Sequence, residues 1–269
     1  MTFFIVGLGM MGSSYAKKLS QLNHLVYGYD HDPYTNNLAL EKGFIKSNNI
    51  NKLLKADYII LCLYPKDNVL FLKTHQTLIN PNAFVTDISG VKTNMIKEIK
   101  QIIPNPYMSH HPMAGSEIKG IKGVNTEIFK DANFIIINDN NKQTEIEKLL
   151  WLKEALGFGN VTMTSKEVHD QMIAFTSQLP HALAIALVNS DLYQNTKDFT
   201  GDSFRDLTRI ARINESLWSM LFLDNNTHLL NDLYQFKDAL SKIIKAIETN
   251  DEDTLKALMI KAKEKRDSY

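Results

Sequence analysis

Phe3-Phe-Ile-Val-Gly-Leu-Gly-Met-Met-Gly12 is a short apolar run followed by three glycines in the spacing Gly-x-Gly-x-x-Gly. The run predicts a buried strand, and the helical pattern after it predicts a strand–turn–helix unit. In such a unit Gly7 permits a tight turn, Gly9 lets the backbone approach a pyrophosphate, and Gly12 lets the helix pack on the strand. The helix start also attracts phosphates through its free N–H groups. The motif therefore predicts a dinucleotide-binding turn.

A carboxylate closes the second apolar run, Leu25-Val-Tyr-Gly-Tyr-Asp30, 18 residues after the last glycine of the motif. At the end of a second strand, Asp30 can accept hydrogen bonds from the hydroxyls of an adenosine ribose and would repel a 2′-phosphate. No arginine follows it directly, so we expect NAD rather than NADP. We also expect Met10 and Met11, within the glycine turn, to contact the cofactor.

The first part of the chain alternates apolar runs with helical patterns. Further strands are expected at residues 58–63, 83–86, 134–137 and 161–163, and helices at residues 68–78 and 142–156. Continuous apolar runs are typical of strands buried on both faces of a parallel sheet. The alternation predicts an α/β fold of the Rossmann type, a doubly wound parallel sheet with crossover helices.

The pattern changes near Thr164. Beyond it no convincing strand run occurs, and apolar residues recur at helical spacing in residues 182–188, 236–247 and 251–265. A length of 269 residues suits two domains. We predict a dinucleotide-binding domain over residues 1–164 and an all-α domain over residues 165–269.

The composition narrows the choice of partners. Lys and Arg number 30, as do Asp and Glu, so the net charge is zero. Binders of nucleic acid or membrane surfaces usually carry excess positive charge, so neither partner is expected. The lone Cys62 lies in an apolar run, which fits a cytoplasmic protein. We find no signal peptide, and no run of about 18 apolar residues that could span a membrane.

Polar and turn-forming residues follow the third and fourth predicted strands. Tyr64 and Pro65 end one of them, and Asp87 lies at the end of the next. Ligands bind at the carboxyl ends of strands in doubly wound sheets. We therefore expect these residues to line the nicotinamide half of the cofactor.

The densest cluster of reactive side chains is Ser109-His-His-Pro-Met-Ala-Gly-Ser-Glu117. We expect a loop here after a short strand, and loops that end the strands of a rigid sheet often hold catalytic residues. Five other histidines are interpreted as structural or solvated side chains: His24, His31, His75, His169 and His228.

Several segments resemble, in order and spacing, the prephenate and arogenate dehydrogenases. They are the glycine turn, Asp30, Thr86-Asp87, His111-Pro-Met-Ala-Gly-Ser-Glu117, Leu179-Pro-His181, Asp206-Leu-Thr-Arg-Ile-Ala211 and Trp218. The resemblance covers almost the whole chain, and the histidine loop is more specific than the glycine motif. It implies a Rossmann domain followed by a helical domain that forms a homodimer.

The resemblance also implies a reaction, the oxidation of prephenate by NAD with loss of CO₂, giving 4-hydroxyphenylpyruvate in tyrosine biosynthesis. A hydride must leave the carbon that bears the hydroxyl, and the hydroxyl proton must be drawn off. A neutral imidazole suits this step because its unperturbed pKa is about 6.5. Similarity assigns the role to His111 rather than His110. No metal is expected, because loss of CO₂ and aromatisation drive the reaction and no metal-ligand spacing occurs.

Prephenate is a dianion, so its site needs fixed positive charge. Arg209 is the first candidate because guanidinium binds carboxylate bidentately. Arg205 lies four residues earlier and is expected on the same helical face, with Arg212 as a further candidate. The resemblance adds three more substrate contacts: His181 at an expected helix start, Glu117 and Trp218.

Two positions depart from the family pattern where substrate contacts are expected. The family commonly has Gly then Ser after Thr-Asp and one further residue, whereas this chain has Ser89 then Gly90. Ser89 could supply the missing hydroxyl only if the turn is rearranged. Gln178 stands where the family often has a second histidine.

Three alternatives stay open at this point. Arogenate could replace prephenate as the substrate. A small β-hydroxy acid is a second alternative, but enzymes of that kind usually rely on a lysine in the first helix of the second domain, where Lys166 is the sole nearby candidate. A non-catalytic NAD-binding sensor would keep the glycines and Asp30 but would not need a histidine–arginine pair.

Overall fold

The computed structural model describes residues 1–115 and 118–269 of the chain. Its first sheet is parallel throughout, in the strand order β2-β1-β3-β4. A second, three-stranded sheet has the order β5-β6-β7. The strands are β1 Thr2–Val6, β2 Leu25–Tyr29, β3 Tyr58–Leu61, β4 Phe84–Asp87, β5 His110–Pro112, β6 Phe134–Ile137 and β7 Val161–Thr164.

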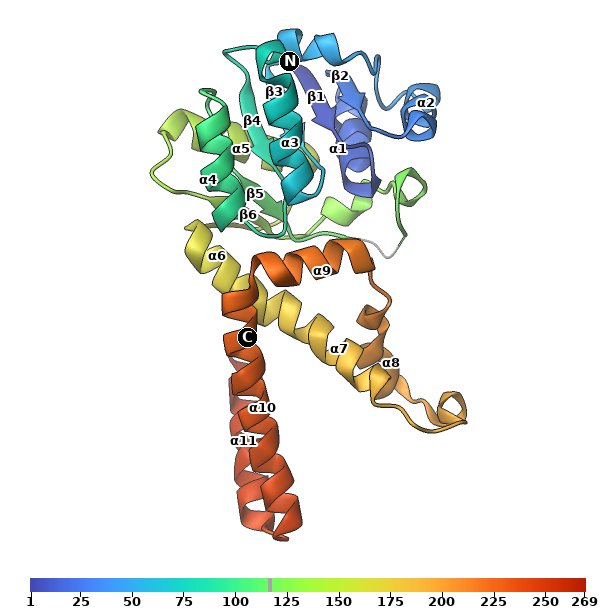
Figure 1. The fold of residues 1–269 in the computed structure, drawn as a ribbon, viewed down its shortest axis with the longest axis vertical. Coiled ribbons are helices and arrows are strands. Elements are labelled where there is room, and N and C mark those ends of the chain that lie inside the picture. Colours follow the sequence, from blue (N-terminus) through green and yellow to red (C-terminus); the bar gives the residue numbers. More distant parts are fainter. Residues whose placement is uncertain (116–117) are drawn as a thin grey trace.

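Helices cover both faces of the first sheet and form the rest of the chain (Figure 1). In the first part they are α1 Met10–Gln21, α2 Pro33–Glu41, α3 Pro65–His75, α4 Thr93–Ile102 and α5 Gln143–Leu156. Beyond β7 they are α6 Lys166–Ile173, α7 Leu179–Asn189, α8 Asp202–Thr208, α9 Glu215–Asp224, α10 Asn226–Glu248 and α11 Glu252–Asp267.

The alternation along β1 explains why this sheet is buried on both sides. Phe3 and Ile5 belong to one hydrophobic cluster, whereas Phe4 and Val6 belong to the other. All four are fully buried. Successive side chains of a strand point to opposite faces, so one apolar run contributes to two cores. The expected Rossmann-type sheet followed by a helical part is confirmed.

The histidine segment differs from the expected loop. His110 to Pro112 form β5, which pairs antiparallel with β6, while β6 pairs parallel with β7. A strand of three residues gives too short a pattern to distinguish it from a loop. A bridge between Val85 and Tyr107 brings the segment beside β4. The two histidines point in different directions, because neighbouring residues of a strand face opposite ways.

The first helix after β7 does not break at Pro180. A π-helical segment, Ala174–Gln178, joins α6 directly to α7, so Pro180 lies inside a continuous helix rather than at a helix start. Proline lacks an N–H, and its ring clashes with the carbonyl four residues earlier. A widened π turn is one of the ways in which a helix accommodates such an interruption. His181 is therefore held within a continuous helix.

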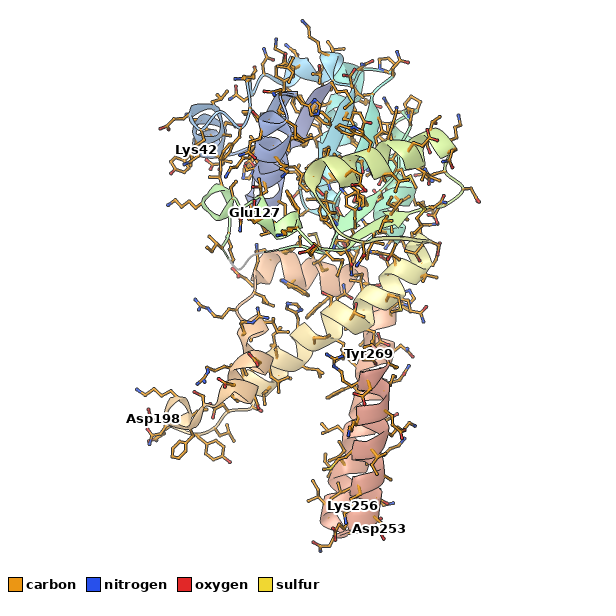
Figure 2. All side chains as sticks on the ribbon, turned by 180° about the vertical axis from the view of Figure 1, so that it is seen from behind. Lys42, Glu127, Asp198, Asp253, Lys256 and Tyr269 are labelled. Atoms are coloured by element: carbon orange, nitrogen blue, oxygen red, sulfur yellow. The ribbon has the colours of Figure 1, made fainter. Side chains whose placement is uncertain are left out.

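The helical part extends away from the sheet as two projections. In Figure 1 the α10–α11 hairpin leads away from the first domain, and the segment between α7 and α8 forms a second arm. Figure 2 shows Asp198 near the tip of that arm and Asp253 and Lys256 at the end of the hairpin. The helix over Lys166–Asn189 is long and apolar enough to span a membrane by length and composition, although such a helix is also common in protein cores.

Candidate active site

A cavity of about 600 Å³ lies where the carboxyl ends of the strands face the helical part. Its lining comes from the glycine turn, the segments after β3 and β4, β5, α7, α9 and the turn before α9. Eleven of the residues expected to form the site line it together: Gly9, Met10, Met11, Gly12, Tyr64, Pro65, Ser89, His111, His181, Arg209 and Trp218.

The glycine turn has the geometry that a pyrophosphate requires. Gly7 has a φ of +89°, which is the left-handed region that favours glycine. A Cβ on Gly12 would lie 1.9 Å from the Gly7 carbonyl oxygen, whereas a Cβ on Gly9 would meet nothing within 4 Å. In the part of the chain that the structure describes, no side chain caps the start of α1. Its first N–H groups are therefore left for an anionic group, and these residues fit a dinucleotide.

Asp30 lies at the end of β2, beside this turn, and is 8% exposed. Its Oδ2 accepts a hydrogen bond from the Leu8 N–H at 2.8 Å, and its Oδ1 accepts from the Asp32 N–H at 3.0 Å. The backbone thus holds the carboxylate at the edge of the glycine turn. A fixed anion there suits a ribose with free hydroxyls and opposes a 2′-phosphate.

The two adjacent histidines face different surroundings. His110 is fully buried, with Nε2 3.0 Å from the Tyr15 hydroxyl and Nδ1 2.7 Å from the Thr86 hydroxyl. His111 lines the cavity, and its Nδ1 lies 2.9 Å from His169 Nε2. Of the pair, only His111 is placed to meet a ligand.

Both imidazoles are neutral near pH 7. Burial and the charge of Lys92 lower the pKa of His110 to about 3. Burial is also the main cause that holds the pKa of His111 well below its ordinary value, with His169 and Lys92 acting in the same direction. A neutral imidazole can accept a proton, which is what a general base requires.

His169 and Asp170 belong to this site, although His169 was expected to be a structural or solvated side chain. Both are buried, and His169 Nδ1 lies 2.8 Å from Asp170 Oδ1. His169 follows His111 by 58 residues, so no local pattern links them. The one signal available from sequence is an adjacent His–Asp pair in the first turns of the boundary helix.

A second group of side chains lies across the cavity from the glycine turn. The His181 ring stacks on Trp218 with centroids 3.6 Å apart, and His181 Nδ1 donates to the Ser177 carbonyl at 2.8 Å. Burial lowers the pKa of His181, and the nearby charge of Arg209 acts in the same direction. Among the lining residues that the structure describes, Lys119, Arg209 and Arg212 are cationic and none is a carboxylic acid.

Arg205 and Asp87 lie elsewhere than expected. The Arg205 guanidinium contacts Asp202 Oδ1 at 2.6 Å and the Thr200 carbonyl at 2.8 Å, away from the cavity lining. These two contacts hold the Arg205 side chain at the start of α8, whereas Arg209 lies in the cavity lining. Asp87 is fully buried beneath the cavity. Glu117 lies outside the described residues.

The two departures from the family pattern have different surroundings. Ser89 lines the cavity, but its Oγ accepts a hydrogen bond from Asn68 Nδ2 at 3.1 Å, while Gly90 lines the cavity without a side chain. Gln178 is not in the cavity lining: its amide donates to the Leu221 carbonyl and accepts from Asn225 Nδ2. Gln178 thus ties helices together instead of facing a substrate.

Lys166 is not placed for catalysis on a β-hydroxy acid. Its Nζ lies 3.0 Å from Asp139 Oδ2 and 2.9 Å from Glu167 Oε1, and it does not line the cavity. Among residues 1–115 and 118–269, no group of three or more His, Cys, Asp or Glu side chains could hold a metal ion.

Tyr64 joins the two sides of the cleft. Its hydroxyl, just after β3, accepts a hydrogen bond from Asn214 Nδ2 at the start of α9 with a length of 2.9 Å. The glycine turn and the cationic side chains Arg209 and Arg212 therefore line one shared cavity. A fold and cleft of this kind define an NAD-dependent dehydrogenase, in which a Rossmann domain and a helical domain share one site.

Comparison with known families identifies which dehydrogenase family this is. The model described as "Prephenate dehydrogenase, nucleotide-binding domain" matches residues 15–158, and the model described as "Prephenate dehydrogenase, dimerization domain" matches residues 165–261. The chain belongs to the prephenate dehydrogenase family.

Individual relatives agree with this assignment. A cyclohexadienyl dehydrogenase of Zymomonas mobilis is 29% identical over 93% of this chain and 90% of its own length. The prephenate dehydrogenase of Aquifex aeolicus, solved with hydroxyphenyl propionate and NAD⁺, superposes with a TM-score of 0.90 at 26% identity, covering 100% of this chain and 98% of that one. A Synechocystis arogenate dehydrogenase superposes with a TM-score of 0.85 at 25% identity, covering both chains fully.

Proposed function

We propose that this protein catalyses the NAD-dependent oxidative decarboxylation of prephenate to 4-hydroxyphenylpyruvate, a step of tyrosine biosynthesis. The observation that carries the proposal is the shared cavity, in which the neutral imidazole of His111 and the guanidinium of Arg209 lie beside the glycine turn. The reaction needs three parts: a general base, a group that binds the anionic substrate, and a turn that binds the cofactor.

His111 acts as the general base in this proposal. Its neutral imidazole accepts the proton of the substrate hydroxyl, which lets the carbon–oxygen double bond form as the hydride leaves the same carbon. NAD⁺, when bound, supplies the acceptor for that hydride. Burial of His111 favours the neutral form and so keeps the base available near pH 7.

Cationic and aromatic side chains bind the substrate. Arg209 pairs with a carboxylate, and the positive charges of Lys119 and Arg212, which also line the cavity, favour a dianion. The stacked rings of His181 and Trp218 give a flat wall beside it. We assign Ser89 to the lining of the substrate pocket, with its hydroxyl engaged by Asn68.

Cofactor binding is assigned to the glycine turn and the neighbouring strand ends. The turn would hold the pyrophosphate through Gly7, Gly9 and Gly12, with Met10 and Met11 beside it, and Asp30 would hold the adenosine ribose. Tyr64 and Pro65 would line the nicotinamide half. Asp87 would act indirectly: its carboxylate accepts a hydrogen bond from the Ser89 N–H and so shapes the turn after β4, which lines the cavity.

We assign residues 1–164 to the NAD-binding domain and residues 165–269 to substrate binding and homodimer formation. Large apolar side chains are exposed on α10 and on the arm after α7: Leu192, Tyr193, Phe199, Tyr234, Leu240, Ile243 and Ile247. A second copy of the chain would cover them, as the dimerization-domain family supports. A neutral chain with a single, unpaired cysteine fits the cytoplasm.

The decisive experiment is NADH release measured side by side with prephenate and arogenate, using NAD⁺ and NADP⁺. We expect turnover of prephenate with NAD⁺, and a fall in kcat of at least about 100-fold in His111→Asn, as removal of a general base implies. His228→Asn, outside the cavity, serves as the matched control. Turnover with arogenate alone would move the activity to that substrate, and an unchanged rate in His111→Asn would refute the mechanism.

A further inference from the structure

Three side chains form a continuous hydrogen-bonded chain that leads away from the cavity. His111 Nδ1 lies 2.9 Å from His169 Nε2, and His169 Nδ1 lies 2.8 Å from Asp170 Oδ1. His169 is 1% exposed and Asp170 is 4% exposed, so water has little access to the contact between these two side chains. The hydrogen-bonded chain ends on the Asp170 carboxylate, which also accepts hydrogen bonds from backbone N–H groups.

The contacts of Asp170 determine its protonation state. Its Oδ1 accepts from the Lys92 N–H at 2.9 Å, and its Oδ2 accepts from the Thr93 N–H at 2.8 Å. Burial alone would raise the pKa of Asp170, but the hydrogen bonds from His169 and Thr93 hold it below its ordinary value. An ionised carboxylate only accepts hydrogen bonds. The His169 nitrogen that faces it must therefore carry a proton.

The ionised Asp170 carboxylate also determines which ring nitrogens of His169 and His111 carry a proton. Burial is the main cause that lowers the pKa of His169, so its ring is neutral and carries one proton, on Nδ1. His169 Nε2 is then an acceptor, and the His111 nitrogen that faces it must be the donor. A neutral His111 with its proton on Nδ1 has its lone pair on Nε2. Nε2 is the nitrogen left over for a substrate.

We propose that Asp170 and His169 are positioning residues that fix the tautomer of His111, so that Nε2 is always the proton acceptor. The proposal rests on the proposed role of His111 as the base. When Nε2 takes the hydroxyl proton, the Nδ1 proton can move to His169 Nε2, which leaves His111 neutral and the positive charge on His169 beside the Asp170 carboxylate. One proton enters and none is lost, so no further reactant is needed.

The same chain joins the base to the contact between the two domains. Asp170 is on α6, and the N–H groups that it accepts from belong to Lys92 and Thr93 at the start of α4 in the first domain. Among the residues that the structure describes, Lys92, His110 and Asp87 are the other charged or titratable groups that act on the two histidines. The orientation of the base therefore depends on how α6 docks against α4.

Asp170→Asn is the test, because an amide nitrogen in place of one carboxylate oxygen can donate to His169 Nδ1 and reverse the tautomers. In ¹⁵N-histidine-labelled protein without substrate, we expect the wild-type His111 to carry its proton on Nδ1, with the signal assigned by its loss in His111→Asn. In Asp170→Asn we expect the proton on Nε2. We also expect kcat to fall by about 100-fold or more, as for a base held in the wrong tautomer, with the KM for prephenate and the Kd for NAD⁺ changed less than about twofold.

Asp139→Asn is the matched control. Asp139 also joins the domains, by accepting from the Lys166 N–H at the start of α6, but it does not touch the histidines. We expect this variant to keep both the wild-type tautomer and kcat. A wild-type His111 that carries its proton on Nε2 would overturn the proposal without any variant, and so would an unchanged tautomer and kcat in Asp170→Asn. A protein with the inferred tautomer but no turnover of prephenate would refute the proposed function alone.

Discussion

Lys92 Nζ lies 2.9 Å from Asp87 Oδ1, and neither side chain is exposed to water. Lys92 also donates to the His110 carbonyl at 2.7 Å, and the Tyr107 hydroxyl donates to Asp87 Oδ2 at 2.7 Å. Burial alone would raise the pKa of Asp87, but the charge of Lys92 and the hydrogen bonds that the Asp87 carboxylate accepts hold it below its ordinary value. The pair links the end of β4 to the start of the β5 segment, directly beneath the cavity.

Loss of one partner of this pair should be costly. Lys92→Met leaves a buried carboxylate without its cation, and we expect the free energy of unfolding to fall by about 3–5 kcal/mol. The double variant Lys92→Met/Asp87→Leu should recover most of the loss, because no lone charge remains. Urea unfolding of the three proteins measures both effects. A single variant within about 0.5 kcal/mol of wild type would contradict this view of the pair.

The buried His110 makes stability depend on pH. Its pKa lies near 3 in the folded protein but at its ordinary 6.5 when unfolded, so the unfolded chain takes up the proton first. The stabilisation is complete above pH 6.5 and is lost as the pH falls through this window, by about 1.4 kcal/mol per pH unit for this group. His111 and His169, whose pKa values are also lowered, act in the same direction.

Urea unfolding at pH 7, 6 and 5 tests this prediction. In His110→Asn the free energy of unfolding should fall less steeply with decreasing pH than in wild type. The difference in slope should correspond to about one bound proton. His228→Asn, whose position is far from this buried group in the sequence, provides the comparison. Equal slopes in wild type and His110→Asn would show that another group is responsible.

Two glycines of the same turn should respond differently to alanine. Gly12→Ala places a Cβ against the Gly7 carbonyl, so we expect a loss of about 3 kcal/mol in the free energy of unfolding. Gly9→Ala meets no protein atom and should leave stability unchanged, but its methyl group occupies the approach to the pyrophosphate. We expect the Kd for NAD⁺ to rise at least about tenfold in Gly9→Ala. Thermal unfolding and NAD⁺ titration distinguish the two; a strongly unstable Gly9→Ala would contradict the prediction.

Arg209 and Arg205 form a matched pair for substrate binding. Arg209 lines the cavity, so Arg209→Ala should lower kcat/KM for prephenate by at least about 30-fold, which corresponds to about 2 kcal/mol. Arg205 binds Asp202 and the Thr200 carbonyl instead, and Arg205→Ala should change kcat/KM less than about threefold. Steady-state kinetics with saturating NAD⁺ measures both. A larger effect at Arg205 would reverse these assignments.

Local patterns were sufficient for the parts of this fold that depend on neighbouring residues. The glycine turn with Asp30, the buried strands and the start of the helical part near Lys166 could all be predicted, because each is encoded within a few consecutive residues. Pro180 was misleading because the π turn before it compensates for the missing N–H, and nothing in the local sequence indicates such a turn.

The site residues that belong to a local motif could be predicted from the sequence, but the contacts between segments far apart in the sequence could not. The histidine loop directed attention to His111. The contact of His111 with His169 arises from the docking of α6 against the sheet, which no local pattern encodes. Arg205 was expected beside Arg209 because of its helical spacing, but its contacts with Asp202 and the Thr200 carbonyl hold it at the start of α8.

The unbroken helix from Lys166 to Asn189 constrains how the enzyme can open. It carries His169 below the base and His181 on the opposite wall, 12 residues later and thus about 18 Å further along one axis. Because one continuous helix carries both residues, a movement of this helix would displace both sides of the cavity together. A movement of this helix that widens the entrance would also separate the His169 imidazole from His111. The open form would then lack the support of the base, and oxidation of the substrate would require closure of the cavity around it.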